Sequence, residues 1–181
     1  MKKGRLNQIF SRKRVIILAI LWVIINIAFR VGPWSTAALE EVSGTNKIPD
    51  IMLSYDLDSL RNLFATYGHE GIVIYKNIQL IDFIYPLIYG ALLLGLLVRV
   101  GVHHNFKMVY GFPIVIVISD YCENFLLRHF VNIYPNLTSD DSALIGFSSF
   151  ISSQKWSYIV LVLVNIIGFW IWNKIPKKSN S

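Results

Sequence analysis

The sequence predicts an all-α membrane protein, a four-helix bundle with a helical extracytoplasmic loop. Hydrophobic residues make up 54% of the 181 residues and charged residues only 15%, against roughly 25% in a soluble domain. Four apolar runs are each close to the length of about 20 residues that a helix needs to cross a bilayer. The runs are Val15 to Trp34, Ile78 to Val98, Met108 to Leu127 and Trp156 to Trp172. We therefore expect residues 1–181 to form a single integral membrane domain.

The charge distribution predicts the orientation of the chain. Basic residues gather before the first run, and the positive-inside rule places such a segment in the cytoplasm. With four spans, the carboxyl terminus returns to the same side. The basic residues at the two ends are Lys2, Lys3, Arg5, Arg12, Lys13, Arg14, Lys174, Lys177 and Lys178. The net charge of +6 thus points to anionic lipids as partners and not to nucleic acid.

The first span carries Arg30 near its outer end, roughly 22 Å from its inner end at 1.5 Å per residue. At that depth the guanidinium either reaches the outer headgroups or serves as a counter-ion to acids on another span. Both interpretations stay open at this point.

The outer loop, residues 35–77, contains a second helical pattern. Asp56 or Asp58 could cap its start, and Gly68 could end it. We expect a short amphipathic helix here and a further helix that runs from Gly71 without a break into the second span. The apolar stripe of the amphipathic helix comprises Leu57, Leu60, Leu63, Phe64 and Tyr67.

Polar residues lie within the second and third spans. Asp82, Tyr85 and Tyr89 share one face of the second span, where Pro86 frees a backbone carbonyl. On the third span, polar side chains at i, i+3 and i+4 share a face, and Cys122 points away from them. These side chains are Asp120, Glu123 and Asn124. Acids inside a membrane segment are costly and mark candidate functional positions.

Counting residues along the antiparallel spans brings these positions together. Asp120 lies roughly 18 Å along the third span, at the same outer depth as Asp82 and Arg30. We therefore expect one polar cluster in the outer half of the membrane. Its candidate ligand-binding members are Arg30, Asp82, Tyr85, Tyr89, Asp120, Glu123 and Asn124.

The cluster leaves several functions open. It could be a structural hydrogen-bonded network, in an accessory subunit of a larger membrane complex. It could bind a cationic or polar small molecule. It could also hold Mg²⁺ or Ca²⁺ on Asp82, Asp120 and Glu123 and act as an enzyme of lipid headgroup chemistry. No catalytic residue is assigned, and the lone Cys122 excludes an intramolecular disulfide.

Two motifs carry a resemblance to a known family. Asp82 to Gly90 reads DFIYPLIYG, and Asp120 to Asn124 reads DYCEN. These segments resemble an uncharacterised family of small bacterial four-span integral membrane proteins with D-x-x-x-P-x-x-Y-G and D-x-x-E-N spans. The likeness covers about Ser54 to Phe125 and the Lys155-Trp156 pair. It implies a location in the cell membrane and supports the site, but it adds no reaction.

Overall fold

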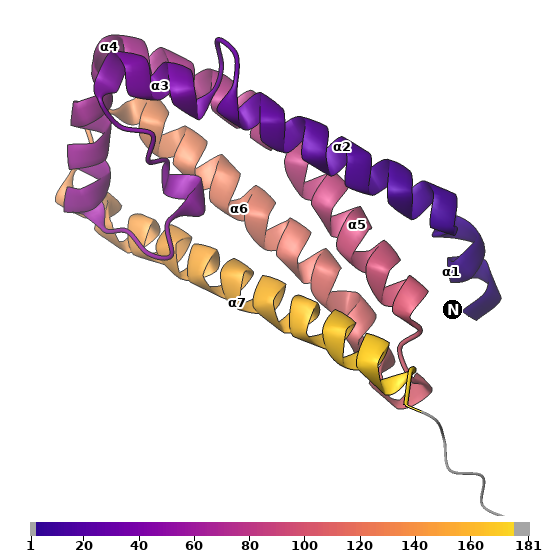
Figure 1. Ribbon diagram of the computed structural model, residues 1–181. Helices are drawn as coiled ribbons and strands as arrows, with labels where there is room; N and C mark the ends of the chain where they lie inside the picture. Colours follow the sequence, from indigo (N-terminus) through magenta and orange to yellow (C-terminus); the bar gives the residue numbers. More distant parts are fainter. Residues whose placement is uncertain (1–2, 176–181) are drawn as a thin grey trace, which may run out of the picture.

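The computed structural model describes residues 3–175, and within that part every regular element is helical. Figure 1 shows a row of helices side by side, in the order α2 (Arg12–Arg30), α5 (Tyr85–Val100), α6 (Phe112–Ile133) and α7 (Ser142–Trp172). The all-α prediction is confirmed. The short α1 (Lys3–Ile9) and the end of α7 lie at the same end of the bundle (Figure 1). Lys2, Lys177 and Lys178, which support the expected orientation, lie outside the described residues.

Three helical stretches of the described chain are long and apolar enough to cross a membrane: Leu57–Val100, Asn105–Ile133 and Ser139–Trp172. The shorter α2 is bounded by Arg14 and Arg30, and its uncharged stretch is about 22 Å long at 1.5 Å per residue. A bilayer core is about 30 Å thick. The expected first span is therefore a weaker candidate than the other three.

The connection from α2 to α4 contains a helix that the sequence pattern did not predict. This helix, α3 (Thr36–Ser43), begins where the Ser35 hydroxyl accepts a hydrogen bond from the Ala38 N–H, and it ends at Gly44 in the left-handed region. A single turn, η1 (Pro49–Ile51), follows. Residues 45–56, which include η1, lead to α4 (Leu57–Asp82). In Figure 1 this segment lies with α3 at one end of the bundle.

The amphipathic helix is present as the first part of α4. Asp56 and Ser59 form a capping box at its start. Leu60, Phe64 and Tyr67 of its apolar stripe are buried. At Gly68 the backbone turns to φ 61° and ψ −170°, a conformation that favours glycine, so the stop predicted there is seen as a kink within α4.

The junction between α4 and α5 interrupts the second expected span. Phe83 and Ile84 keep right-handed backbone angles, but α5 starts anew at Tyr85 with Pro86 in its first turn. Proline has no N–H and displaces the carbonyl four residues earlier, which here is that of Asp82. This predicted free carbonyl accepts a hydrogen bond from Asn124 Nδ2 at 3.4 Å, and the Phe83 carbonyl accepts one from the Tyr121 hydroxyl at 2.7 Å.

The last two long helices differ in register from the expected spans. After the turn η2 (His104–Gly111), α6 starts at Phe112, four residues beyond Met108. The turn η3 (Ser139–Asp141) precedes α7, which starts at Ser142 and not at Trp156. The serine-rich stretch before Trp156 is therefore helical, and this places Lys155 in the middle of α7 instead of at its entry.

Two hydrophobic cores fill the bundle. One lies toward α3 and the first part of α4 and includes Phe64, Tyr75, Leu127 and Ile145. The other lies toward the opposite end and includes Leu97, Val109, Ile116 and Val162. Along α6 and α7 the polar residues fall between these two sets, so the polar cluster is enclosed by apolar packing at both ends.

Candidate functional site

Lys155 is the centre of the cluster. Its side chain is only 5% exposed, and its ammonium group lies 2.9 Å from Asp120 Oδ1 and 2.5 Å from Glu123 Oε2. Both acids are buried as well, with Asp120 4% and Glu123 0% exposed. A buried charge is tolerated when it is paired and hydrogen-bonded, and this lysine satisfies both acids of the D-x-x-E-N segment at once.

The polar face of α6 is arranged as the helical spacing predicts. Asp120, Glu123 and Asn124 are buried, whereas Cys122 is exposed. The hydroxyl of Tyr89 on α5 donates a short hydrogen bond to Asp120 Oδ2. The side chains of Tyr89, Asp120 and Glu123, all expected in the cluster, therefore belong to one connected network around Lys155.

Asp82 lies in the same region, at the break between α4 and α5. It is 8% exposed and lies within electrostatic range of Asp50, Asp120 and Lys155. Asn124 binds the Asp82 backbone carbonyl. The expected approach of Asp82 to the acids of α6 thus occurs in the structure.

A further acid, Asp50, reaches the cluster from the turn η1. Its carbonyl accepts a hydrogen bond from Lys155 Nζ at 3.4 Å, and its Oδ2 accepts one from the Tyr75 hydroxyl at 2.9 Å. The chain of hydrogen bonds continues from Gln79 to Tyr75, and Arg128 donates to Gln79 Oε1 at 3.4 Å. Burial raises the pKa of the Asp50 carboxyl above its ordinary value, against the opposing charge of Lys155.

Tyr55 contacts the cluster at Glu123 and Ser148. Its hydroxyl shares a 2.7 Å hydrogen bond with Ser148 Oγ and donates to Glu123 Oε1 at 3.5 Å. Burial and the neighbouring Glu123 charge raise the pKa of the Tyr55 hydroxyl, so it stays a neutral donor.

The cluster contains more acid than base. The buried carboxyls are Asp50, Asp82, Asp120 and Glu123, and among the described residues Lys155 is the buried cation that contacts them. The half-buried Arg128 guanidinium donates to Gln79 and to the Lys76 carbonyl, and not to a carboxylate. With every group ionised, the enclosed charge would be strongly negative, which is costly in a low-dielectric site.

Two acceptor oxygens of the cluster have no hydrogen-bond donor in the described protein. They are Asp50 Oδ1 and Asn124 Oδ1. Among the described residues, the other buried side-chain polar atom without a hydrogen bond is the indole nitrogen of Trp156. Because buried polar atoms are nearly always hydrogen-bonded, the two oxygens are the positions at which a proton, a water or a donor-bearing ligand would bind.

Two residues of the expected cluster make no hydrogen bond or ion pair with its described acids. The Tyr85 hydroxyl accepts hydrogen bonds from Trp22 Nε1 at 3.0 Å and Asn26 Nδ2 at 3.5 Å, so it joins α5 to α2. Arg30 is exposed and makes no ion pair with a described residue. Its interpretation as the counter-ion of the α6 acids was wrong, because Lys155 occupies that position.

The geometry gives no support to a metal site. Among the side chains that the structure describes, no group of three His, Cys, Asp or Glu residues is arranged to hold a metal ion. Lys155 Nζ already lies between Asp120 and Glu123, where a divalent cation would be repelled by the ammonium group.

Sequence reasoning missed Lys155, Asp50 and Tyr55. A signal for Lys155 was present in the spacing of α7, because its buried positions follow a helical period through the serine-rich stretch. These buried positions are Ile145, Ser148, Ser149, Ser152, Lys155 and Val162. Asp50 and Tyr55 carry no comparable signal, since they lie in a connection whose path depends on tertiary contacts.

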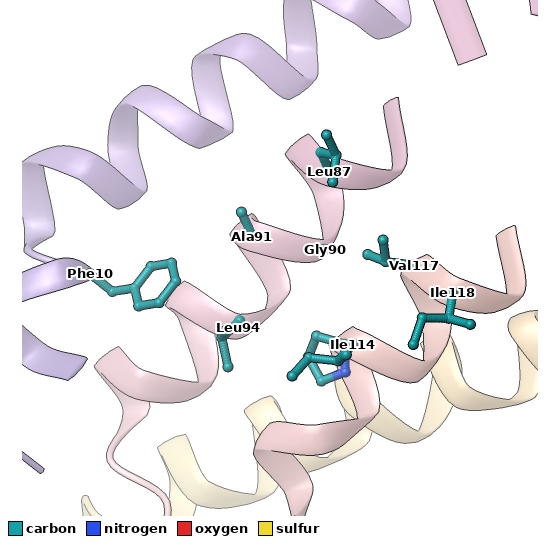
Figure 2. A pocket seen from close by; sticks show the side chains of 9 residues that line it. Phe10, Leu87, Gly90, Ala91, Leu94, Ile114, Val117 and Ile118 are labelled. Atoms are coloured by element: carbon teal, nitrogen blue, oxygen red, sulfur yellow. The ribbon is translucent and has the colours of Figure 1, made fainter. Parts of the chain in front are cut away.

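A separate groove lies on the outside of the bundle, between α5 and α6 (Figure 2). It has a volume of about 230 Å³ and apolar side chains from both helices, with Phe10 at one end. The helices approach closely there, since a Cβ on Gly90 would lie 2.2 Å from Val117 Cγ2. Its lining suits an acyl chain of the surrounding lipid and supplies no group for chemistry.

In comparisons with known proteins, no family model, curated protein or solved structure matches this chain. The resemblance of its two motifs to a bacterial membrane protein family therefore stays a prediction. Any functional conclusion has to come from the cluster itself.

Proposed function

We propose that the chain is a multi-pass protein of the cell membrane, with four spans and both termini in the cytoplasm. Three spans have the required length and apolarity. The fourth, α2, packs along α5 and exposes apolar side chains such as Ile20, Ile24 and Ile27. Its terminal basic residues can extend toward the headgroups and so lengthen a short apolar stretch. The arrangement of α1 and the end of α7 at one end of the bundle (Figure 1) agrees with this orientation.

We further propose that the polar cluster binds a cation or a polar ligand that bears N–H donors. The observation that carries this proposal is the excess of buried carboxyls around Lys155. A second positive charge, or bound protons, would balance Asp50 and Asp82. The free acceptor oxygens on Asp50 and Asn124 offer hydrogen bonds to such a ligand.

The chemistry of the donor set favours an ammonium group over a metal ion. Carboxylate and amide oxygens accept hydrogen bonds from an ammonium group, and the same atoms also serve as ligands of Ca²⁺. An ammonium ion carries a single charge, so it is repelled less by Lys155 than a divalent ion is. The alternative of a metal-assisted enzyme of lipid headgroup chemistry uses the same acids and would need a metal beside this lysine.

A purely structural network is the second candidate, and one observation favours it. Lys155 satisfies Asp120 and Glu123 directly, while Tyr89 and Tyr55 complete their hydrogen bonds. This part of the cluster is sufficient to hold α5, α6 and α7 in register. It does not explain why Asp50 and Asp82 are buried beside it, and this favours ligand binding.

The test is thermal unfolding of the detergent-solubilised protein with methylammonium, Mg²⁺, Ca²⁺ or Mn²⁺. A ligand present at about 100 times its Kd and bound only to the folded state adds roughly 2.7 kcal/mol. We expect methylammonium to raise the melting temperature of the wild type, and we expect Asp82→Asn to lose this increase. Asp58→Asn is the matched control, because the Asp58 side chain is 86% exposed.

Three other outcomes would each reject binding of an ammonium-type ligand by the cluster. An increase seen only with a divalent ion and lost in Asp82→Asn would favour the metal enzyme. No increase with any cation, together with a lower melting temperature for Asp82→Asn, would leave the structural network. An increase that Asp82→Asn retains would place the bound cation outside the cluster.

A further inference from the structure

We propose that residues 45–56, the strap, form a cover that lifts from the polar cluster and admits its ligand. This inference rests on the proposed ligand binding for its purpose, but it has independent structural support. The strap contains one short turn, η1, and no other regular element. It crosses the same end of the bundle as α3 (Figure 1).

The strap is held to α7 by serine hydroxyls. Ser152 Oγ donates to the Met52 carbonyl at 2.9 Å, and Ser153 Oγ donates to the Leu53 carbonyl at 2.6 Å. Further along the strap, the Tyr55 N–H donates to Ser149 Oγ at 2.8 Å. These are side-chain to backbone hydrogen bonds, each of modest net strength.

On its inner side the strap contributes directly to the cluster. Asp50 is contacted by Lys155 from α7 and by Tyr75 from α4. The Tyr55 hydroxyl reaches Glu123 on α6. When the strap lifts, Asp50 and Tyr55 leave together, and the acids of α4 and α6 become accessible.

The serines have alternative partners in the open state. A serine hydroxyl within a helix can donate to the carbonyl four residues earlier. Ser157 of the same helix already does so, with its Oγ 2.9 Å from the Ser153 carbonyl. When the strap is released, Ser152 and Ser153 can therefore keep a hydrogen bond within α7, while the Tyr67 hydroxyl loses the Lys47 carbonyl, which it contacts at 2.6 Å in the closed position.

The two ends of the strap can accommodate the movement. Gly44, just before it, adopts φ 71°, and no heavy atom lies within 4 Å of the position of its absent Cβ. At the other end Asp56, the last residue of the strap, is fixed to the start of α4 by its capping box with Ser59. The outer side of the strap is unpacked, with Ile51 59% and Leu53 67% exposed.

The experiment measures how fast a buried cysteine on the strap reacts with a charged, membrane-impermeant thiol reagent. Ile48→Cys is the reporter, because Ile48 is 6% exposed; the full-length chain carries Cys122→Ser so that the native thiol is absent. We expect Ser152→Ala/Ser153→Ala to speed labelling about thirtyfold, from the loss of two hydrogen bonds of ordinary strength. Ser157→Ala is the matched control and should leave the rate unchanged.

Unfolding is monitored with Val162→Cys, since Val162 is fully buried in α7 and distant from the strap in sequence. This cysteine should stay unlabelled throughout. If Val162→Cys is labelled in the double serine variant, the single variant Ser153→Ala is used in its place. We then expect Ile48→Cys to be labelled about fivefold faster than without Ser153→Ala. The proposal is overturned if folded serine variants label no faster than Ser157→Ala, or if Ile48→Cys already reacts as fast as Leu53→Cys. Labelling requires no ligand, so this result is separate from the cation test.

Discussion

Replacement of Lys155 by methionine is the sharpest perturbation of the cluster. Methionine retains an unbranched side chain of similar length but removes the ammonium group that contacts Asp120 at 2.9 Å and Glu123 at 2.5 Å. The side chains of the two acids are 5% and 0% exposed. Water cannot hydrate either carboxylate at this depth, so both would remain as uncompensated buried charges.

The expected loss of stability follows from that burial. Removal of one partner of a buried ion pair typically costs about 3–5 kcal/mol. For a chain of this length, each kcal/mol lowers the melting temperature by about 2–4 °C. We therefore expect Lys155→Met to melt about 6–20 °C below the wild type at pH 7. Lys107→Met is the control, because Lys107 is exposed and should change the melting temperature little.

The assay is thermal unfolding in detergent, followed by intrinsic tryptophan fluorescence between pH 5 and pH 8. Because protons neutralise the orphaned Asp120 and Glu123, the deficit of Lys155→Met should shrink as the pH falls. The triple variant Lys155→Met/Asp120→Asn/Glu123→Gln carries no charge at these positions and should recover part of the loss. The account is refuted if Lys155→Met melts with the wild type at pH 7, or if the triple variant melts as low as Lys155→Met.

Three further predictions concern single positions. Burial raises the pKa of the Asp50 carboxyl. The stability that this carboxyl contributes is therefore present at low pH and is lost as the pH rises through its pKa in the folded protein. We expect Asp50→Asn to flatten the dependence of the melting temperature on pH. Gly68→Ala should cost about 1–3 kcal/mol because φ is 61° there, whereas Gly146→Ala, with open space around it, should be neutral or stabilising. Gly90→Ala should cost about 1–3 kcal/mol because its Cβ would lie 2.2 Å from Val117 Cγ2. Adding Val117→Ala to the same chain should restore part of that loss. Denaturation midpoints measure the stability of all these glycine variants.

The elements that sequence reasoning anticipated were those determined by local rules. The capping of α4 at Asp56 and its interruption at Gly68 follow from side-chain and backbone preferences of single residues. The shared face of Asp120, Glu123 and Asn124 follows from helical spacing alone. Proline chemistry similarly predicted a free backbone carbonyl in the second span, although the structure was needed to identify it as that of Asp82 and its donor as Asn124.

The central cation was missed because a local rule gave the wrong result. Lys155 stands before the apolar run that starts at Trp156, and lysine next to tryptophan is typical of a membrane interface. The helix nevertheless extends back to Ser142, because its serines bind the strap and Tyr55 instead of facing solvent. Such contacts join residues about 100 positions apart, and no window on the sequence contains both partners.

Arg30 was one of two open interpretations for the counter-ion, and that interpretation failed for a related reason. Depth along a helix can be counted from the sequence, but the direction in which a side chain points around the bundle cannot. Arg30 has the expected position at the end of α2, yet its side chain is exposed. Tyr85 likewise turns toward α2, where Trp22 and Asn26 donate to its hydroxyl.

The central claim is that the cluster encloses more carboxyls than Lys155 can balance. Infrared spectroscopy of the membrane-reconstituted protein tests it directly, because a protonated buried carboxyl has its own C=O stretching band. At pH 7 we predict such a band in the wild type, weakened in Asp50→Asn or Asp82→Asn, and reduced when methylammonium displaces the proton. If the wild type shows no protonated carboxyl at pH 7 and methylammonium changes nothing, the excess of buried acid is not real and the proposed binding site fails with it.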